Sequence, residues 1–383
     1  MFSSRATDPG QACDAALRNP PWEAPNNGPV RLAQVEMIPF ARTAVKDPEP
    51  SRICLMDVAV VGAGSWGTAL ALILARNGHE VGVFGRDDEA FHSFRSCREN
   101  LTYLPGYILP AEASFHILDG SPIQAGVVVV AVPSSAVREI LPVLSDAEVV
   151  CIASKGLDAA SGRVLSDVVA EGVPGVKLAA LSGPNLAVEL AQSIPTVAVS
   201  ASEDESVAER VRGLFMCRNY RVYVSDDMRG VELAGSLKNV MAIAAGMSDG
   251  LGYGDNTKGA LLARGLSEMA RLGVKMGAKL DTFLGIAGVG DLFATAASKL
   301  SRNYRVGFGL GKGERLDQIL ASLGQVAEGV PTAKTAVRLA RQHGVQVPIT
   351  EVMQNVIEGT LKAKDSVSLL MERAPAKEGV FGE

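Results

Sequence analysis

The stretch from Val58 to Phe84 constrains the fold of this 383-residue chain more than any other. It reads VAVVGAGSWGTALALILARNGHEVGVF: a short apolar run, a glycine-rich turn, a helical pattern that ends at an Asn-Gly pair, and a second apolar run. A G-x-G-x-x-G turn between a strand and a helix, with a second strand behind it, is typical of a nucleotide-binding β-α-β unit. The stretch therefore predicts a strand over 58–61, a helix, and a strand over 80–84.

The three glycines of this turn have separate roles in binding a dinucleotide. Gly62 lets the chain turn, Gly64 lets the backbone approach a pyrophosphate, and Gly67 lets the helix pack on the strand. The N–H groups and the dipole at the start of the helix favour the phosphates. A glycine turn without a ligand is the alternative, and the complete setting argues against it.

Two charged residues follow the second strand and bear on the choice of cofactor. An acid at this point usually binds the ribose hydroxyls of NAD, whereas an arginine suits the extra phosphate of NADP. Arg86 and Asp87 are both present. The sequence leaves the choice between NAD and NADP open, and Arg86 favours acceptance of NADPH.

Three later runs rich in β-branched residues predict further strands of the same sheet. They are GVVVVAVPSSAV, EVVCIASKGLD and KLAALSGPNLAVEL. Such runs are typical of a mostly parallel sheet covered on both faces, where ligands gather at the carboxyl ends of the strands. Each polar residue at these ends is a candidate contact, with a helix cap or a loop residue as the equal alternative. These residues are Ser134, Ser154, Lys155, Gly183 and Asn185.

A composition shift predicts a second domain. The β-branched runs stop after Tyr223, and helical patterns take over, which places a boundary near Ser225. The expected fold is an α/β, Rossmann-type, doubly wound, mostly parallel sheet in residues 53–225, followed by an all-α C-terminal domain in residues 226–383. The long helical patterns cover 257–276, 333–342 and 350–358.

Residues 1–52 are expected to form an arm outside both domains. They hold eight of the chain's 19 prolines and no sustained apolar period, so we expect no fold of their own. They lack the apolar core of a secretory signal and do not resemble a transit peptide. Because Met56 stands directly before the first strand, we expect either a later natural start or a dispensable arm.

Composition excludes several classes of protein. The net charge of -5 gives no bulk attraction for nucleic acid or an anionic membrane. Five widely spaced cysteines without a C-x-x-C pair indicate neither a disulfide framework nor a zinc site, and fit a reducing cytoplasm. The uncharged run 58–75 reaches the lower length limit of a membrane span, but the glycine-rich turn divides it, so we expect no integral membrane segment.

One lysine lies where an apolar residue is expected. In VELAGSLKNVMAIAAGM, residues 231–247, apolar or small residues surround Lys238 at helical spacing, so its amine should emerge on the most hydrophobic stripe of a helix. A buried lysine usually has a depressed pKa, an acidic partner or a ligand. A structural, ion-paired lysine and a catalytic one are both open from this pattern alone, and the neighbouring nucleotide domain favours the catalytic one. Asp291, in a glycine-rich setting, is a candidate to orient Lys238 or to accept from a substrate hydroxyl, with a helix cap as the alternative.

The segment 285–313, GIAGVGDLFATAASKLSRNYRVGFGLGKG, is expected to lie between helices and to hold a phosphate. Its glycines would expose backbone N–H groups close to Arg302, Asn303 and Arg305. The final GLGKG has the wrong spacing for a Walker loop, which disfavours a kinase or an ATPase. The sequence also has no H-E-x-x-H, no G-x-S-x-G and no histidine pair at metal spacing, so we expect no metal site.

Together these motifs resemble a known family. From about residue 57 to residue 359 the chain is similar to the NAD(P)-dependent glycerol-3-phosphate dehydrogenases of the bacterial type, which interconvert sn-glycerol 3-phosphate and dihydroxyacetone phosphate. The matching stretches, in the family's order, are GAGSWGTALA, ASKGL, SGPNLAVEL, ELAGSLKNVMAIAAGM, DNTKGALLARG, GVGDL, SRN and VAEGVPTA.

The resemblance implies roles for residues at the matching positions. Lys238 coincides with the lysine that transfers the proton. Cofactor contacts are implied for Ser65, Trp66, Arg86, Lys155, Ala187, Arg302, Val326 and Glu328. Substrate contacts are implied for Lys155, Gly183, Asn185, Asp291, Ser301, Arg302 and Asn303. Asn185 stands where the family often has Ser, and ATAAS replaces a more Thr-rich segment after Asp291, so the fine contacts there can differ.

The resemblance also implies a homodimer that supplies glycerol 3-phosphate for phospholipid synthesis. Two alternatives stay open at this point. A keto-acid reductase of the same layout, such as a ketopantoate reductase, would need a site for a carboxylate. A non-catalytic NADP-sensing module would bind the cofactor without oxidising it, and would leave Lys238 unexplained.

Overall fold

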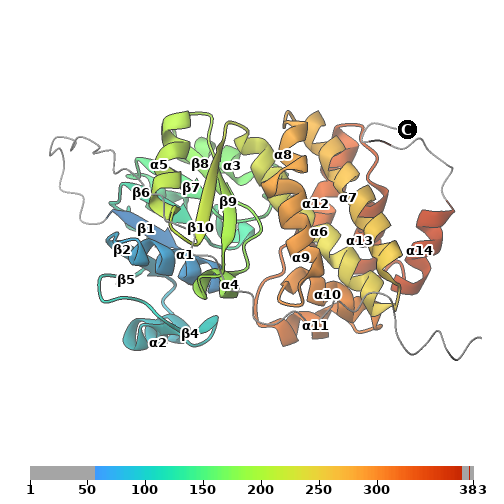
Figure 1. The fold of residues 1–383 in the computed structure, drawn as a ribbon, viewed down its shortest axis with the longest axis horizontal. Coiled ribbons are helices and arrows are strands. Elements are labelled where there is room, and N and C mark those ends of the chain that lie inside the picture. Colours follow the sequence, from blue (N-terminus) through green and yellow to red (C-terminus); the bar gives the residue numbers. More distant parts are fainter. Residues whose placement is uncertain (1–56, 373–378, 380–383) are drawn as a thin grey trace, which may run out of the picture. The chain divides into compact units, whose positions relative to one another are not determined.

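The computed structural model describes residues 57–372 and residue 379. The expected arm, residues 1–52, lies outside the described residues, and so does Met56. The described residues all belong to one compact unit. Within the described part, an α/β half comes first in the chain and a helical half follows, as Figure 1 shows from blue to red.

The α/β half is built on an eight-stranded sheet with the order β10-β9-β8-β7-β6-β1-β2-β5. The run from β5 to β8 is the doubly wound order of a dinucleotide-binding fold, and its neighbouring strands are parallel. β9 pairs with β8 in antiparallel fashion, and β10 is parallel to β9. The predicted fold class is therefore confirmed. The strands are β1 (Val58–Val61), β2 (Val81–Gly85), β5 (Ser114–Ile117), β6 (Val127–Val130), β7 (Val149–Ile152), β8 (Lys177–Ser182), β9 (Thr196–Ala201) and β10 (Tyr220–Ser225).

Both faces of the sheet are covered. Side chains alternate along each strand, so a strand such as β1 contributes to a core on each face. Val58 and Val60 of β1 face one core, and Ala59 and Val61 face the other. The first core includes residues of α1 (Ser65–Arg76), α2 (Glu89–Cys97), α4 (Ala187–Ala191) and α5 (Glu205–Phe215). The second includes residues of α3 (Leu165–Gly172) and η3 (Leu141–Leu144), and the short η2 (Ser134–Ala136) precedes them in the chain.

A small antiparallel pair, β3 (Glu99–Asn100) and β4 (Leu104–Ile108), lies between α2 and β5 in the chain. The sequence pattern did not predict it, because its residues show neither a sustained alternation nor a continuous apolar run. β4 lies beside α2 in Figure 1. Asn100 of β3 contacts the glycine-rich turn after β1.

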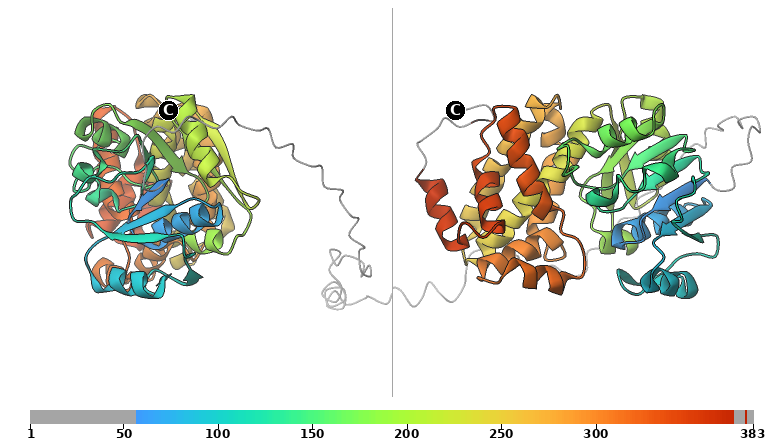
Figure 2. Two further views of the ribbon diagram at one scale, coloured as in Figure 1. Left: turned by 90° about the vertical axis from the view of Figure 1, so that its left-hand side faces the viewer. Right: turned by 180° about the vertical axis from the view of Figure 1, so that it is seen from behind.

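The helical half is organised around α6 (Met228–Gly250), which is buried along almost its whole length. The predicted helix around Lys238 is therefore confirmed, and so are the helices predicted near residues 257, 333 and 350. Figure 1 and the rear view in Figure 2 show these helices gathered on one side of the sheet. The others are α7 (Asp255–Lys275), α8 (Leu280–Leu284), η4 (Ile286–Gly290), α9 (Asp291–Ala297), α10 (Arg302–Gly311), α11 (Leu316–Leu323), α12 (Gly329–Gln342), α13 (Pro348–Ile357) and α14 (Ala363–Met371).

The segment 285–313 differs from the prediction. It was expected to lie between helices and to expose glycine N–H groups, but it forms η4, α9 and α10. Gly307 and Gly311 of α10 face α6 so closely that a Cβ would lie 1.8 Å from the Ile243 oxygen and 2.5 Å from the Met247 oxygen, respectively. Gly246 of α6 faces α10 in the same way. These glycines let two helices approach closely, which is why they do not serve as a loop.

Within residues 57–372, no helix combines the length and the apolar character that a membrane crossing requires. The uncharged run 58–75 forms β1, the glycine turn and most of α1.

The contact between α6 and α10 predicts a strong effect of a single methyl group. Gly307→Ala should lower the free energy of unfolding by about 3 kcal/mol, the upper range for overpacking, because the added Cβ meets rigid backbone. Gly259→Ala is the matched control, since Gly259 lies in α7 with no atom near its Cβ position. It should raise stability by about 0.5–1 kcal/mol. Chemical denaturation of both variants checks this, and equal effects would contradict the packing argument.

Candidate active site

Two lysines from opposite halves of the fold share one buried carboxylate. Lys238 of α6 donates to Asp291 Oδ1 at 2.9 Å and to Thr295 Oγ1 at 2.6 Å. Lys155, just after β7, donates to Asp291 Oδ2 at 2.8 Å and to the Gly183 carbonyl at 2.8 Å. Asp291 is 1% exposed and Lys238 is 5% exposed. The predicted residues Lys155, Gly183, Lys238 and Asp291 therefore form one cluster.

The fold places each member of this cluster. Lys155 and Gly183 follow β7 and β8, so they lie at the carboxyl ends of neighbouring parallel strands. Gly183 has φ +141°, a conformation that favours glycine. Asp291 begins α9 directly after η4, a π-helical turn of the kind often found at functional sites. Gly288 permits that turn, because a Cβ there would lie 2.1 Å from the Phe283 oxygen.

Burial and charge decide the protonation states in the cluster. Burial alone would raise the pKa of the Asp291 carboxyl, but the ammonium groups of Lys155 and Lys238 outweigh it and hold that pKa below its usual value. Burial lowers the pKa of the Lys238 amine to about 8, against the opposing effect of Asp291. Lys238 is therefore an ammonium that can lose its proton close to neutral pH.

The cluster carries an excess of positive charge. Two ammonium groups and one carboxylate sum to +1, and Arg302 is near enough to lower the pKa of Lys238 further. Buried charge of this kind favours a ligand that brings or develops negative charge. Lys238 thus has the acidic partner and the depressed pKa that its position in the sequence indicated.

The glycine turn has the geometry that a dinucleotide requires. Gly62 has φ +118°, and a Cβ there would lie 2.7 Å from the Ala131 backbone. A Cβ at Gly67 would lie 1.8 Å from the Gly62 oxygen, whereas Gly64 has no neighbouring atom within 4 Å of its Cβ position. The turn is therefore tightly held at both ends and open at Gly64, which fits a pyrophosphate at the start of α1. Trp66 donates through Nε1 to the Ala153 carbonyl at 3.0 Å.

A segment of the helical half reaches the nucleotide side of the sheet. Glu328 accepts from the Ser134 N–H at 2.8 Å and from the Ser134 hydroxyl at 2.6 Å. Ser65 donates to Gln325 at 3.4 Å. Burial raises the pKa of Glu328, which its bonds with Ser134 and its attraction to Arg302 oppose. Val326, between these two contacts in the chain, is 47% exposed.

The start of α10 is tied to α6 next to the catalytic candidate. Asn303 donates to Asn239 Oδ1 at 2.8 Å and accepts from the Gly329 N–H at 2.9 Å. Ser301 caps α10 by accepting from the Tyr304 N–H at 3.2 Å. Burial lowers the pKa of the Arg302 guanidinium. The bridge between Asn239 and Asn303 therefore ties the backbone next to Lys238 to the backbone next to Arg302.

Three predicted residues have a weaker structural connection with this cluster. Arg86 follows β2 and is 80% exposed, with Asp88 at 3.3 Å. Asn185 donates to the Val197 carbonyl at 2.8 Å and accepts from the Tyr220 hydroxyl at 3.2 Å, so its amide is engaged within the fold. Ala187 begins α4 and packs against the sheet.

Sequence reasoning missed two polar residues that hold the cluster. Thr295 contacts both Lys238 and Asp291. It lies four residues after Asp291, a spacing that places both on one helix face, so the pattern contained this signal. Asn239, which bonds Asn303, also donates to the Lys155 carbonyl at 3.2 Å. No local pattern distinguishes it from other polar residues next to a buried lysine.

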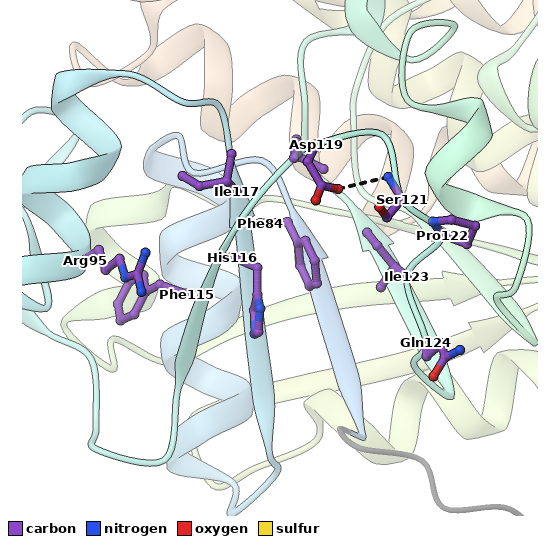
Figure 3. Close-up of a pocket in the computed structure, with 11 residues that line it drawn as sticks. Phe84, Arg95, Phe115, His116, Ile117, Asp119, Ser121, Pro122, Ile123 and Gln124 are labelled. Atoms are coloured by element: carbon purple, nitrogen blue, oxygen red, sulfur yellow. Dashed lines mark hydrogen bonds between the residues drawn. The ribbon is translucent and has the colours of Figure 1, made fainter.

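A separate pocket lies at the far edge of the sheet, on β2, β5 and the segment after β5. Figure 3 shows the Phe84 and His116 rings side by side, and their centroids are 4.8 Å apart. Burial, and to a lesser extent Arg95, lowers the pKa of His116. None of the predicted site residues lines this pocket.

Comparison with known proteins identifies the family. A profile described as "NAD-dependent glycerol-3-phosphate dehydrogenase N-terminus" matches residues 57–208, and the corresponding C-terminus profile matches residues 227–368. A Bacillus mycoides protein named glycerol-3-phosphate dehydrogenase (NAD(P)+) is 43% identical over 332 residues, which cover 85% of this chain and 98% of that protein. A Moorella thermoacetica protein of the same name is 44% identical over 337 residues, 85% of this chain and 99% of its own.

A solved structure gives the same result. The crystal structure of glycerol-3-phosphate dehydrogenase from Coxiella burnetii has a TM-score of 0.80 and 36% identity, and the match covers 83% of this chain and 99% of that chain. Both halves of the fold, the nucleotide turn and the helical half with Lys238, fall within the matched regions. The chain belongs to the NAD-dependent glycerol-3-phosphate dehydrogenase family.

Proposed function

We propose that this enzyme interconverts sn-glycerol 3-phosphate and dihydroxyacetone phosphate with NAD(P)H. The observation that supports this most is the buried Lys238 amine, which shares the Asp291 carboxylate with Lys155 from the sheet half. When bound, the cofactor supplies the hydride that reduces the ketone carbon. The chain must then stabilise and protonate the oxygen that becomes an alkoxide.

Lys238 is suited to that second task. Its ammonium is desolvated, so its attraction to a developing alkoxide is stronger than in water. Asp291 and Thr295 fix the direction of the amine. In ketone reduction the ammonium donates its proton to the oxygen, and in alcohol oxidation the neutral amine accepts the proton.

The two halves divide the work in this proposal. Residues 53–225 would hold the cofactor through Gly62, Gly64, Ser65, Trp66 and Gly67. Residues 226–383 would supply Lys238 and the phosphate contacts. Arg302 is our choice for the phosphate, because its fork of donors matches phosphate oxygens and it is partly buried at the start of α10. The other implied contacts are Arg86, Ala187, Val326 and Glu328 for the cofactor, and Lys155, Gly183, Asn185, Asp291, Ser301 and Asn303 for the substrate.

We also propose three further properties, of which the homodimer and the role in phospholipid synthesis rest on the family resemblance. The enzyme would be a cytoplasmic homodimer, and its glycerol 3-phosphate would serve phospholipid synthesis. The widely spaced cysteines suit a reducing compartment. Light scattering after gel filtration would test the dimer.

The proposed reaction can be tested through Lys238. The wild type should oxidise NADPH with dihydroxyacetone phosphate. Lys238→Met should retain NADPH binding and lose at least about 100-fold in kcat, the low end of general acid-base effects. Lys334→Met, at an exposed site on α12, is the control and should keep full activity. Absorbance decay at saturating substrate measures this, and near-normal turnover of Lys238→Met would assign the lysine to structure.

The pH dependence follows from the Lys238 amine. Reduction needs the ammonium, so its kcat/KM should fall as pH rises through about 8. Oxidation needs the neutral amine, so its kcat/KM should rise through the same pH. Asp291→Asn removes a carboxylate that raises the pKa of Lys238, so any residual oxidation should have its limb at lower pH. A wild-type limb that stays near 10.5, the ordinary lysine value, would refute the role of burial.

Phosphate recognition gives a further prediction. Arg302→Ala should raise KM for dihydroxyacetone phosphate by about 10- to 100-fold, the loss of one or two charged hydrogen bonds, and by more than Lys238→Met does. Arg315→Ala, at an exposed residue paired with Asp317, is the control. Unphosphorylated dihydroxyacetone should be a poor substrate of the wild type and should show little difference between the wild type and Arg302→Ala. Equal KM effects of the Arg302 and Lys238 variants would contradict separate roles.

A further inference from the structure

Asn100 makes a contact with the nucleotide turn that the sequence pattern did not reveal. It lies on β3 and is 2% exposed. Its side-chain N–H groups donate to the Ala63 carbonyl at 2.9 Å and to Thr68 Oγ1 at 2.7 Å. Its oxygen accepts from the Tyr103 N–H at 3.0 Å. Since the Tyr103 N–H can only donate, it fixes which end of the Asn100 amide is the oxygen.

The contact with Ala63 determines the direction of an N–H group in the turn. The peptide between Ala63 and Gly64 is planar and trans, so its C=O and N–H point in opposite directions. Because Asn100 holds the Ala63 oxygen on its own side, the Gly64 N–H points away from Asn100. Gly64 is also the position with open space around it, where we placed the pyrophosphate.

The neighbouring contacts do not bond the Ala63–Gly64 peptide itself, whereas Asn100 bonds its carbonyl. Gly62 is confined by the Ala131 backbone and by Gly67, and Trp66 is held by the Ala153 carbonyl. These contacts hold the residues on either side of the Ala63–Gly64 peptide. Gly64 has no Cβ to resist rotation, so a glycine-flanked peptide at this point reorients easily unless its carbonyl is held.

We propose that Asn100 is a positioning residue for the cofactor: it locks the Ala63–Gly64 peptide so that the Gly64 N–H faces the pyrophosphate. The pair of strands β3 and β4 thereby acts as a brace for the nucleotide turn. This inference rests on the proposed binding of NAD(P)H by the same turn. It adds a residue more than 30 positions beyond the motif, outside the contacts that the family resemblance implied.

Two variants separate the Ala63 contact from the rest of the Asn100 environment. Asn100→Asp keeps the size of the side chain and can still accept from the Tyr103 N–H and the Thr68 hydroxyl, but it sets a carboxylate against the Ala63 carbonyl. Two acceptors at that distance repel, which drives the peptide to rotate. Thr68→Val removes the other Asn100 contact with nearly the same shape and leaves Ala63 untouched. Asn100→Ala removes the hydrogen bond to the Ala63 carbonyl without adding a repulsive group.

The test measures Kd for NADPH by fluorescence titration, together with kcat and KM for dihydroxyacetone phosphate. We expect Asn100→Ala to raise Kd about tenfold, which corresponds to about 1.4 kcal/mol, and Asn100→Asp to raise it by at least about 30-fold. Thr68→Val should stay within about twofold of the wild type. For all three variants, kcat at saturating NADPH and KM for dihydroxyacetone phosphate should stay within about twofold, because the chemistry takes place at Lys238.

Each outcome has a clear meaning. Unchanged Kd in Asn100→Asp, or an equal rise in Thr68→Val, would overturn the inference, and so would a fall in kcat equal to the rise in Kd. If Asn100→Asp does not fold, as thermal melting would show, Asn100→Ala and Thr68→Val carry the comparison. A wild-type protein that does not bind NADPH would instead refute the proposed function.

Discussion

The carboxylate of Asp291 is the point on which the structure of the site depends. It binds Lys155 through one oxygen and Lys238 through the other, and it is almost wholly buried. Without it, two ammonium groups would face each other in a poorly solvated place, and loss of one partner of a buried ion pair typically costs about 3–5 kcal/mol. Because Lys155 follows the sheet and Lys238 lies on α6, the same carboxylate also joins the two halves of the fold at the site.

The surrounding helices explain how that carboxylate is held in place. The π-helical turn η4 delivers Asp291 to the cluster, and the glycines of α6 and α10 bring these helices into backbone contact. The bridge from Asn239 to Asn303 then fixes the register between them. Lys238 and Arg302 each precede one member of that bridge, so the bridge ties the backbone of one to the backbone of the other. The proposed acid and the proposed phosphate contact are thereby part of one rigid arrangement.

The sequence predicted the parts of the fold that have a strong local pattern. The strand, turn and helix from Val58 onward follow from the apolar runs and the glycine spacing, and the buried position of Lys238 follows from its apolar surroundings. The prediction for segment 285–313 was wrong, because glycine is favoured both in a loop and at a position where two helices pack closely. Which of the two applies depends on the helix that packs against the glycine, here α6, and the local sequence of 285–313 does not specify that helix.

Long-range polar contacts were the other part that the sequence could not supply. The sequence offered Asp291 as a candidate to orient Lys238, but it did not show that the same carboxylate also binds Lys155; the two lysines lie 53 and 136 residues away in the chain. Asn100 and Asn239 act through partners that no periodicity relates to them. By contrast, Thr295 could have been found from its helical spacing to Asp291.

The account depends most directly on the charge state of one amine. NMR titration of protein labelled with ¹³C at the lysine Cε, with Lys238→Met to assign the signal, would follow that amine alone. We predict that the Lys238 signal titrates with a midpoint near 8, below the ordinary lysine value. A midpoint at or above the ordinary lysine value of 10.5 would show that the amine is a permanently charged structural partner of Asp291, and would contradict its role in proton transfer.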